Sequence, residues 1–317
     1  MNRTYDIVGH RKIFYTISLS IIAVALLVSV IFGVEVAIEF KGGTMISYSY
    51  TGDINSEKIE SIASDVVGET VTVTTGESFK DNSKYVQISF TSNDGLTADS
   101  QTELTEKISE EFSDNSIELL SSSNVKPSIG KTFFNKCLVA IAFSSIVLII
   151  YIGLRFKKVG GIPAGVTAIV ALFHDVFIAF ATFVIFRIPI DANFMAVALT
   201  ILGFSINDTI VIYDRIRENK KLMGKKASFE ELVNTSINQS LTRSINTSFA
   251  AVLVMVAVCV VAIVFNVTSI LSFSFPLIIG LISGVYSTIC IAGPLWVDIV
   301  RFKDKKSSSK GRKKVTE

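Results

Sequence analysis

The sequence predicts a polytopic α-helical membrane protein with six TM helices and a ferredoxin-like α+β domain outside the membrane, between TM1 and TM2. Three observations predict this class. Half of the 317 residues are apolar and only 18% are charged, which differs from the usual balance of a soluble domain. The apolar residues form blocks of about 20 or more, enough for a helix to cross roughly 30 Å of hydrocarbon. One polar, strand-rich stretch separates the first block from the others.

The N-terminal part is expected as an uncleaved membrane anchor. Residues 1–12 form a short basic segment, and residues 13–34 form the first apolar block. This block is longer than the 7–15-residue core of a secretory signal peptide, and no clear small-x-small cleavage site follows it. We therefore expect residues 13–34 to be the first span, preceded by a cytoplasmic N-terminus.

The polar stretch, residues 35–131, is expected to be an extracytoplasmic α+β domain. Alternating or β-rich patterns predict strands at 36–50 (interrupted by Gly42 and Gly43), 69–75, 85–90 and 116–125, and helical spacing predicts helices at 56–67 and 97–112. The order β-α-β-β-α-β is that of a ferredoxin-like unit. The stretch holds about 17 acidic and about 7 basic residues, which we interpret as a solvated anionic surface.

The other five spans are predicted within residues 132–300. They are expected at residues 133–154, 161–186, 190–213, 243–265 and 270–300, with a cytoplasmic loop at 214–242. The loop contains a helix candidate that starts at Ser228, with Glu231 at the spacing of a capping box. Gly280 and Gly284 form a G-x-x-x-G pair suited to close helix packing, either within the chain or against a partner. The three cysteines lie in apolar blocks and are expected as buried thiols.

The distribution of lysine and arginine predicts the orientation. These residues concentrate at the N-terminus, at 155–158, at 215–226 and in the basic tail, residues 301–317, which all lie on one side if there are six spans. The opposite short connections are nearly free of them, with Arg187 as the exception. By the positive-inside rule both termini are cytoplasmic and the folded domain faces out. The tail is expected to be disordered and attracted to anionic lipid headgroups.

Two carboxylates and an arginine lie where spanning a membrane requires no charge. Asp208 is about a turn and a half before the charged end of the fourth span, Asp175 is near the middle of the third, and Arg243 begins the fifth. A charged side chain at membrane depth costs about 2.5–3.5 kcal/mol on insertion scales. If all three face one bundle interior, they predict a proton or sodium relay. Interhelical hydrogen bonding by the carboxylates and a snorkelling Arg243 stay open as alternatives.

Polar neighbours surround the two carboxylates in the sequence. Ser205, Asn207 and Thr209 accompany Asp208, and His174 precedes Asp175. His174 is a candidate to assist, although adjacent positions on a helix point to different faces, so ordinary packing is the alternative. A low dielectric favours a neutral carboxylate, whereas a nearby arginine favours a charged one. A movement of the arginine toward and away from the carboxylate would therefore release and bind a proton.

Several other kinds of chemistry are not expected. The sequence has no G-x-x-x-x-G-K-[ST] phosphate loop, so ATP is not the expected fuel. It shows no nucleophile–base constellation, and the external domain lacks metal-ligand spacing. We therefore expect no covalent catalysis, no cofactor, no metal and no nucleic-acid partner. The expected coupling ion is H⁺, with Na⁺ as the alternative.

Three stretches of this sequence resemble a known family. They are EFKGGT at 39–44, VKPSIG at 125–130, and FSINDT at 204–209 running into DRIREN at 214–219. They are similar to SecF, the smaller subunit of the SecD–SecF protein-export complex within the RND superfamily, and the similarity covers nearly the whole chain. The family usually has Asp where this chain has Glu39, and Gly where it has Lys126. Both departures lie in the external domain and its hinge.

The resemblance implies a function and a set of roles. SecD and SecF each supply six spans of a pseudo-symmetric bundle, and proton flow moves external domains that draw an emerging preprotein outward. Asp208 would carry the proton, Arg243 would be the functional arginine of the fifth span, and His174 with Asp175 would be the paired residues of the third. The motif residues with an implied structural role are Gly42, Gly43, Pro127, Gly130, Asp214, Arg215 and Arg217. The implied partners are SecD, the Sec channel with its ATPase, and an unfolded preprotein, in a bacterial or archaeal cell membrane.

Two other classes of function stay open. One is an RND-type half-transporter for a small molecule or lipid, against which the small size of the external domain argues. The other is a non-conducting scaffold subunit, in which Asp208 only holds helices together.

Overall fold

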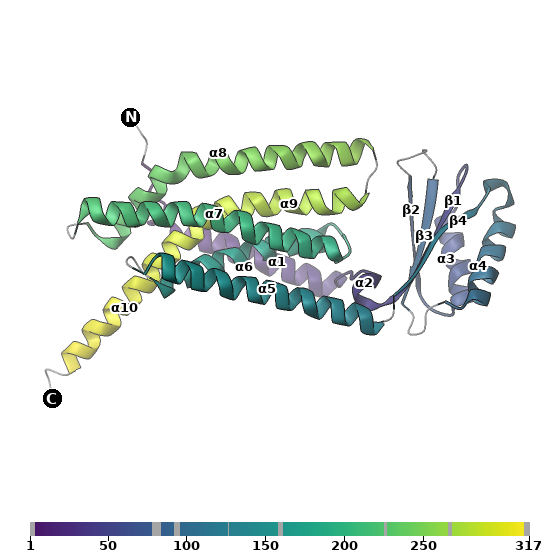
Figure 1. Ribbon diagram of the computed structural model, residues 1–317, viewed down its shortest axis with the longest axis horizontal. Coiled ribbons are helices and arrows are strands. Elements are labelled where there is room, and N and C mark those ends of the chain that lie inside the picture. Colours follow the sequence, from purple (N-terminus) through teal and green to yellow (C-terminus); the bar gives the residue numbers. More distant parts are fainter. Residues whose placement is uncertain are drawn as a thin grey trace.

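The protein is a helical bundle with a small α/β domain at one end. The computed structural model describes residues 4–77, 84–91, 96–125, 127–157, 161–224, 227–265 and 268–313. These residues contain six helices long and apolar enough to cross a membrane, and one four-stranded antiparallel sheet. The fold class predicted from the sequence is therefore confirmed. Both termini lie at the end of the bundle that is distant from the sheet (Figure 1).

The bundle has an inner and an outer set of helices. Its helices are α1 (Arg11–Phe32), α5 (Pro127–Arg155), α6 (Ile162–Ile185), α7 (Ala192–Met223), α8 (Phe229–Val264), α9 (Thr268–Ser287) and α10 (Gly293–Lys313), the last two joined by the π-helical turn η2 (Thr288–Ala292). In the most apolar windows of α6, α7 and the last span, more than half of the residues are buried. The corresponding figure is 11% for each of α1, α5 and α8. An interior site must therefore lie between α6, α7 and α9.

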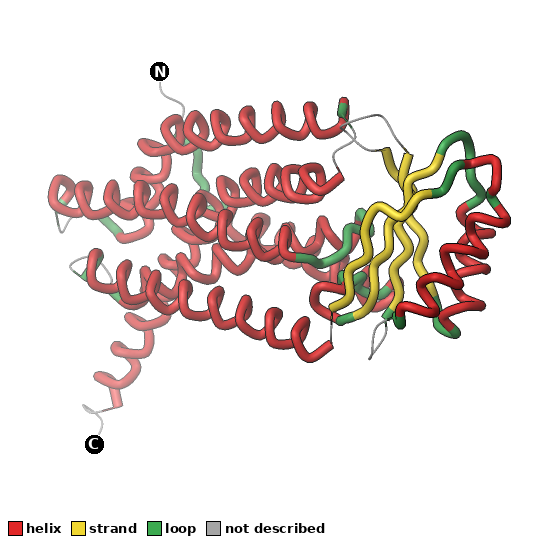
Figure 2. Tube along the Cα trace, turned by 45° about the vertical axis from the view of Figure 1, so that its right-hand side comes forward, coloured by secondary structure: helices red, strands yellow, loops and turns green. Residues whose placement is uncertain are grey.

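The external domain has the predicted βαββαβ order. Its elements are β1 (Gly43–Tyr50), α3 (Ser56–Val67), β2 (Val71–Glu77), β3 (Lys84–Phe90), α4 (Ala98–Glu111), the 3₁₀ turn η1 (Ser113–Asn115) and β4 (Glu118–Val125). The sheet order is β2-β3-β1-β4, with every neighbouring pair antiparallel. The two long helices cover the face turned away from the bundle (Figure 2). Side chains such as Ile46, Ile88 and Leu104 form the core between the sheet and these helices.

Local signals explain why some elements begin and end where they do. The Asn55 side chain accepts hydrogen bonds from the N–H groups of Glu57 and Lys58 at the start of α3, and Gly68 ends that helix in the left-handed conformation. The predicted helix at 56–67 therefore matches α3. Pro127 is the first residue of α5, a position where its missing N–H removes no helical hydrogen bond. For this reason α5 begins before residue 133, where the span was expected.

The predicted strand at 36–50 is wrong over its first half. Residues Ile38–Lys41 form a short helix, α2, and the strand begins only at Gly43. Before α2, Val36 forms a parallel bridge with Ile190, in the connection between α6 and α7. Phe40 packs with apolar side chains at the ends of the spans rather than in the core of the sheet. The apolar residues of this segment therefore attach the domain to the bundle.

The segment expected as a loop at 214–242 is mostly helical. α7 continues to Met223, and α8 runs as one helix from Phe229 through the predicted fifth span. The Oγ of Ser228 accepts a hydrogen bond from the N–H of Glu231, as its spacing predicts. Good helix formers such as Arg, Glu and Lys extend α7 beyond the apolar stretch. The separate helix expected before the fifth span is thus its first part.

The tail expected to be disordered from residue 301 is helical as far as Lys313. A helix that is already nucleated by a membrane span adds residues at low cost, and lysine and arginine favour helix. α10 projects away from the bundle (Figure 1). Residues 314–317 of the tail and the motif residue Lys126 lie outside the described part of the chain.

Candidate functional site: a polar cluster inside the helical bundle

Two buried aspartates lie among otherwise apolar helices. Asp175 of α6 is 0% exposed and Asp208 of α7 is 6% exposed. Ser205, Asp208 and Thr209 of α7 share one face, because residues three and four apart are neighbours on a helix, and all three side chains are buried. The sequence of α7 therefore turns a polar stripe inward, at the depth of Asp175.

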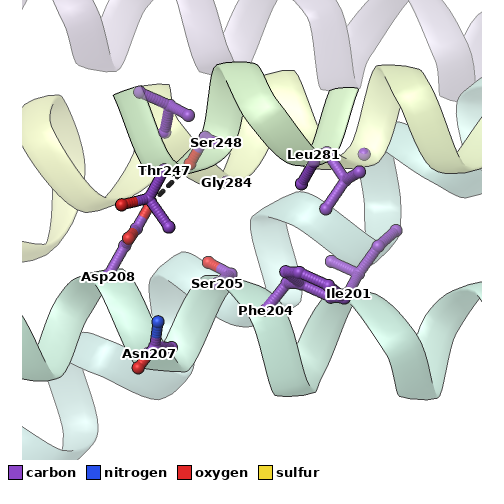
Figure 3. A pocket seen from close by; sticks show the side chains of 12 residues that line it. Ile201, Phe204, Ser205, Asn207, Asp208, Thr247, Ser248, Leu281 and Gly284 are labelled. Carbon is purple, nitrogen blue, oxygen red and sulfur yellow. Dashed lines mark hydrogen bonds between the residues drawn. The ribbon is translucent and has the colours of Figure 1, made fainter. Parts of the chain in front are cut away.

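Asp208 lies beside a small cavity and has one side-chain hydrogen bond among the residues that the structure describes. Ser248 of α8 donates it, with 2.7 Å between Oγ and Oδ2 (Figure 3). The cavity has a volume of about 50 Å³, which is room for a few water molecules. Its lining residues come from α7, α8 and α9 and are Ile201, Phe204, Ser205, Asn207, Asp208, Thr247, Ser248, Ala251, Gly280, Leu281, Gly284 and Val285.

Asp175 lies in a closed shell of donors. Its Oδ2 accepts hydrogen bonds from the hydroxyls of Ser205 (2.7 Å) and Ser287 (2.6 Å). Its Oδ1 accepts one from the hydroxyl of Ser283 (2.7 Å) and lies 3.2 Å from Nδ1 of His174. The three serines come from α7 and α9, so this carboxylate joins three helices.

The environments of the two aspartates share Ser205. Its hydroxyl bonds Asp175, and the residue also lines the cavity of Asp208. One turn further along α7, the hydroxyl of Thr209 lies 3.0 Å from that of Thr288, at the start of η2. The structure therefore brings together Asp175, Asp208, Ser205 and Thr209 in one connected polar cluster.

Arg243 is close enough to Asp208 for an electrostatic interaction, but it is not paired with it. It is exposed on α8 and lines a second cavity, of about 480 Å³, between the ends of α7 and α8 that carry Asp214 and Gln239. Among the described residues it forms no ion pair within 4 Å with either aspartate. It precedes Ser248, the partner of Asp208, by five residues, which is about 7.5 Å along a helix axis.

The two remaining predicted support residues differ in their placement. Asn207 is exposed on α7 and lines the small cavity. His174 is buried, with its ring 5.9 Å from that of Tyr286, and its Nε2 has no hydrogen-bond partner among the described residues. His174 and Asp175 are neighbours in the sequence, and their side chains are nevertheless in contact, because Nδ1 of His174 lies 3.2 Å from Oδ1 of Asp175.

The glycines of the predicted motifs lie at tight backbone positions. Gly42 ends α2, with its N–H bonded to the carbonyl of Ile38 at 2.7 Å. Gly43 has a φ of +145°, and a Cβ there would lie 2.2 Å from the carbonyl oxygen of Phe90. Gly130 is buried near the start of α5.

The charged motif residues lie at the far end of α7 and not in the cluster. Asp214 pairs with Arg217 (2.8 Å) and with Arg155 of α5 (3.4 Å). Arg215 pairs with Glu218 and donates through Nε to Gln239 of α8 at 2.7 Å. These contacts join the ends of α5, α7 and α8.

Sequence reasoning missed the hydroxyl partners on the facing helices. Ser248, Ser283 and Ser287 were not singled out, although each contacts one of the two aspartates. Ser283 and Ser287 are four residues apart in an apolar span, so they share a helix face. This spacing was the signal available in the sequence.

The G-x-x-x-G pair packs within the chain. A Cβ at Gly280 would lie 2.2 Å from Cδ1 of Ile201, and one at Gly284 would lie 3.2 Å from Cβ of Ser205. The two glycines therefore let α9 approach α7 closely, at the level of the polar cluster.

The cluster offers carboxylates and hydroxyls, which are groups able to bind a proton or a small cation. Among the described residues, no three His, Cys, Asp or Glu side chains gather as a metal site. Asp208, with one hydroxyl partner and an adjacent space for water, is able to bind and release a proton or hold a small cation.

Sequence comparisons place this arrangement in a family. The profile described as protein export membrane protein SecD/SecF, C-terminal, matches residues 104–302. The chain is 33% identical to protein translocase subunit SecF of Anaerolinea thermophila, over 91% of this chain and 92% of that protein. It is 31% identical to SecF of Alicyclobacillus acidocaldarius, over 99% and 98%. It is also 32% identical to SecDF of Bacillus subtilis, of which it spans 38%.

Solved structures give the same result. The crystal structure of SecDF from Thermus thermophilus, described as a translocon-associated membrane protein, matches 96% of this chain with a TM-score of 0.78 and 26% identity. A SecDF structure in the super-membrane-facing form matches 98% with a TM-score of 0.69 and 26% identity. The chain spans about 40% of each of these SecDF chains. With its six apolar helices it is a multi-pass membrane protein, and it belongs to the SecD/SecF family of protein export membrane proteins.

Proposed function

We propose that the chain is a SecF-type accessory subunit of the Sec protein-export machinery, which uses an ion gradient to assist late-stage translocation of preproteins. The coupling ion is H⁺, with Na⁺ as the alternative. The observation that carries the proposal is the placement of Asp208, a buried carboxylate that lies beside a cavity with room for a few waters and has, within the described part of the chain, one side-chain hydrogen bond. The family of the chain supplies the process in which such a carboxylate would act.

The geometry supports a simple coupling step. α8 carries both Ser248, which bonds Asp208, and Arg243, five residues away. When Asp208 takes up a proton, it no longer requires a donor or a cation, and α8 is free to shift along α7. When α8 shifts back and brings the guanidinium near, the charged form is favoured and the proton leaves.

The driving force is large enough for such a step. Moving one charge through 100 mV of membrane potential releases about 2.3 kcal/mol. A difference of that size changes the ratio of two conformations about fifty-fold. One proton per cycle is therefore sufficient to reorient the external domain.

The proposed setting includes partners of several kinds. A SecD-type subunit of similar topology completes the bundle, the Sec channel and its ATPase deliver the preprotein, and the unfolded preprotein contacts the external domain. The outer helices α1, α5 and α8 expose most of their apolar windows, which suits contact with lipid or with the partner. The membrane is the bacterial or archaeal cell membrane, with both termini cytoplasmic. The subunit performs no covalent catalysis and needs no cofactor.

Asp208→Asn tests the proposal. We expect normal membrane levels of the variant and of its co-purified partner, and impaired late-stage secretion of a reporter protein. Glu218→Gln is the matched control, because Glu218 is an exposed carboxylate on the same helix, and it should secrete normally. The change at Asp208 removes the titratable group while keeping a side chain that accepts the bond from Ser248.

Two outcomes would contradict the coupling role. Loss of the protein or of its partner in Asp208→Asn would indicate a scaffold in which Asp208 holds helices together. Normal secretion with an impaired flux of a small solute would indicate a half-transporter instead.

A further inference from the structure

We propose that Asp175 is a positioning residue that remains ionised and holds Ser205, and thereby one wall of the Asp208 cavity, rather than a carrier of the transported proton. The predicted relay would then consist of a fixed anion, Asp175, and a titrating carboxylate, Asp208. The inference rests on the proposed function only because that function names Asp208 as the carrier of the proton.

The first argument is the count of donors around Asp175. Three hydroxyls donate to it, those of Ser205 and Ser287 to Oδ2 and that of Ser283 to Oδ1, and Nδ1 of His174 lies 3.2 Å from Oδ1. An ionised carboxylate is purely an acceptor with about four lone-pair positions, so this shell matches its ionised form. A protonated Asp175 would present its own O–H to one of these donors, and that donor would have to turn away.

The second argument is the contrast with Asp208. Within the described residues Asp208 has one side-chain hydrogen bond, from Ser248, and it lines a cavity with room for water. Asp175 is 0% exposed and does not line that cavity. A proton that moves through the bundle needs a path of water or exchangeable groups. The cavity offers such a path to Asp208 and not to Asp175.

The third argument concerns which groups stabilise the buried negative charge of Asp175. Among the described residues, no lysine or arginine lies within 4 Å of it, and its one ionisable contact is His174. The other titratable side chains facing this region are Tyr286 of α9, beside the imidazole, and Asp208 of α7, across Ser205. A buried charge without a cation must be stabilised by hydrogen bonds, which explains why three serines are gathered at one carboxylate.

The fourth argument is what the shell does to the helices. Ser205 lies on α7, and Ser283 and Ser287 lie on α9 on either side of Gly284, where the two helices approach closely. Asp175 thus ties α6, α7 and α9 into one unit, while the polar tie of α8 to this region is Ser248 with Asp208. A fixed anion at Asp175 would hold the inner helices still while α8 responds to the proton.

Infrared spectroscopy of the full chain with its partner in lipid tests the ionisation state. A protonated carboxyl has a C=O stretching band that a carboxylate lacks, and exposed Asp and Glu are ionised near neutral pH. The spectrum of the parent protein minus that of Asp175→Asn should contain no positive carboxylic-acid C=O band at any pH near neutral, while the amide C=O of the introduced asparagine appears with the opposite sign. The same subtraction with Asp208→Asn should contain a positive carboxylic-acid band that depends on pH. A C=O band assigned to Asp175 would overturn the proposal.

The positioning role has its own readout. Ser205→Ala should shift the carboxylate stretching band of Asp175, because one of its three hydroxyl donors is lost, and should shift the pH midpoint of the Asp208 band. Thr182→Val is the matched control on α6, since the Thr182 hydroxyl bonds the backbone of its own helix (3.0 Å to the carbonyl of Ile178). An unchanged Asp208 midpoint in Ser205→Ala would refute positioning. If Asp175→Asn does not assemble, the Ser205→Ala and Ser287→Ala spectra carry the test of ionisation.

These readouts separate the two proposals. The infrared experiments do not depend on protein export. The protonation state of Asp175 can therefore be read even if the protein does not assist secretion. Absence of an Asp208 band in every variant would contradict both the proposed function and the positioning role. The ionised state of Asp175 would still be decided by its own band.

Discussion

Single residues in this protein matter most where a side chain, or the lack of one, decides whether two elements can meet. Ser205 is small enough to face Gly284 and polar enough to bond Asp175. Gly43 plays the corresponding part in the external domain. It begins β1, where it is paired with Val125 of β4 and lies against the backbone of Phe90 in β3. At both positions a larger side chain would separate elements that the fold requires to be adjacent.

Gly43→Ala should destabilise the external domain. A methyl group would lie 2.2 Å from the carbonyl oxygen of Phe90, at a φ of +145° that other residues rarely adopt. We expect a loss of about 1–3 kcal/mol from backbone strain, measured as faster limited proteolysis of the domain in the membrane-bound protein. Gly68→Ala is the control, because its φ of +73° is left-handed but nothing lies within 4 Å of the added carbon. Equal susceptibility of the two variants would show that contact with β3 is not what requires glycine.

The sequence indicated the acidic members of the polar cluster but not their partners. A carboxylate in an apolar span is visible in any sequence, because its burial costs free energy that must be offset. The donors that offset it are distant in the chain, with Ser283 separated from Asp175 by 108 positions. Their pairing depends on how α6 packs against α9, which periodicity within one helix does not specify.

At the scale of elements, α8 is the helix that connects the most distant parts of the bundle. Its first turns lie beside the N-terminal strap, residues 5–8. Asn234 accepts hydrogen bonds from the N–H groups of Ile7 (2.9 Å) and Val8 (3.2 Å), and Asn238 accepts one from Tyr5 (2.7 Å). Further along, α8 supplies Ser248 to Asp208. One rigid helix therefore joins the strap to the polar cluster.

Asn234→Ala should release the N-terminal strap. Three hydrogen bonds to the strap would be lost, from the N–H groups of Ile7 and Val8 and to the carbonyl of Tyr5, each worth about 0.5–1.5 kcal/mol, so local opening should become at least roughly ten-fold more frequent. Hydrogen–deuterium exchange of the N-terminal peptide would show this as faster exchange at Ile7 and Val8. Asn238→Ala should accelerate Tyr5 instead, and Asn246→Ala, at an exposed position of α8, should change neither. Unchanged exchange at Ile7 and Val8 in Asn234→Ala would mean that burial of Val8, which is 0% exposed, holds the strap alone.

The limits of a helix or strand could be predicted from the sequence where a local signal, such as a capping residue, marks its end. The α3 helix has a capping asparagine and a terminal glycine, and its limits follow from those two residues. No such signal separates the apolar and charged parts of α7, or the polar and apolar parts of α8, so each is one helix. Hydropathy marks the edge of a membrane, which is not the same as the end of a helix. The segment at 36–42 escaped prediction for another reason, since its structure depends on pairing with Ile190.

At the scale of the whole molecule, charge differs between the bundle and the α/β domain. Arg155 ends α5, Arg215 and Arg217 lie in the last part of α7, and Arg301 lies in α10, while the α/β domain is acidic. Arg187 is the basic residue on the wrong side of this division, in the connection between α6 and α7. Its guanidinium pairs with Glu35 and donates to the carbonyl of Phe32 at 2.7 Å. Its charge is therefore compensated locally, although Arg187 still counts as a basic residue on that side.

This distribution predicts which end faces the cytoplasm. In a variant with Cys137, Cys259 and Cys290 replaced by alanine, Glu57→Cys reports on α3 of the external domain and Lys303→Cys on the start of the tail, both at exposed positions. Because Lys and Arg are retained on the cytoplasmic side during insertion, a membrane-impermeant maleimide should label Glu57→Cys in intact spheroplasts. It should label Lys303→Cys only after the membrane is opened. Labelling of Lys303→Cys in intact spheroplasts would contradict the orientation.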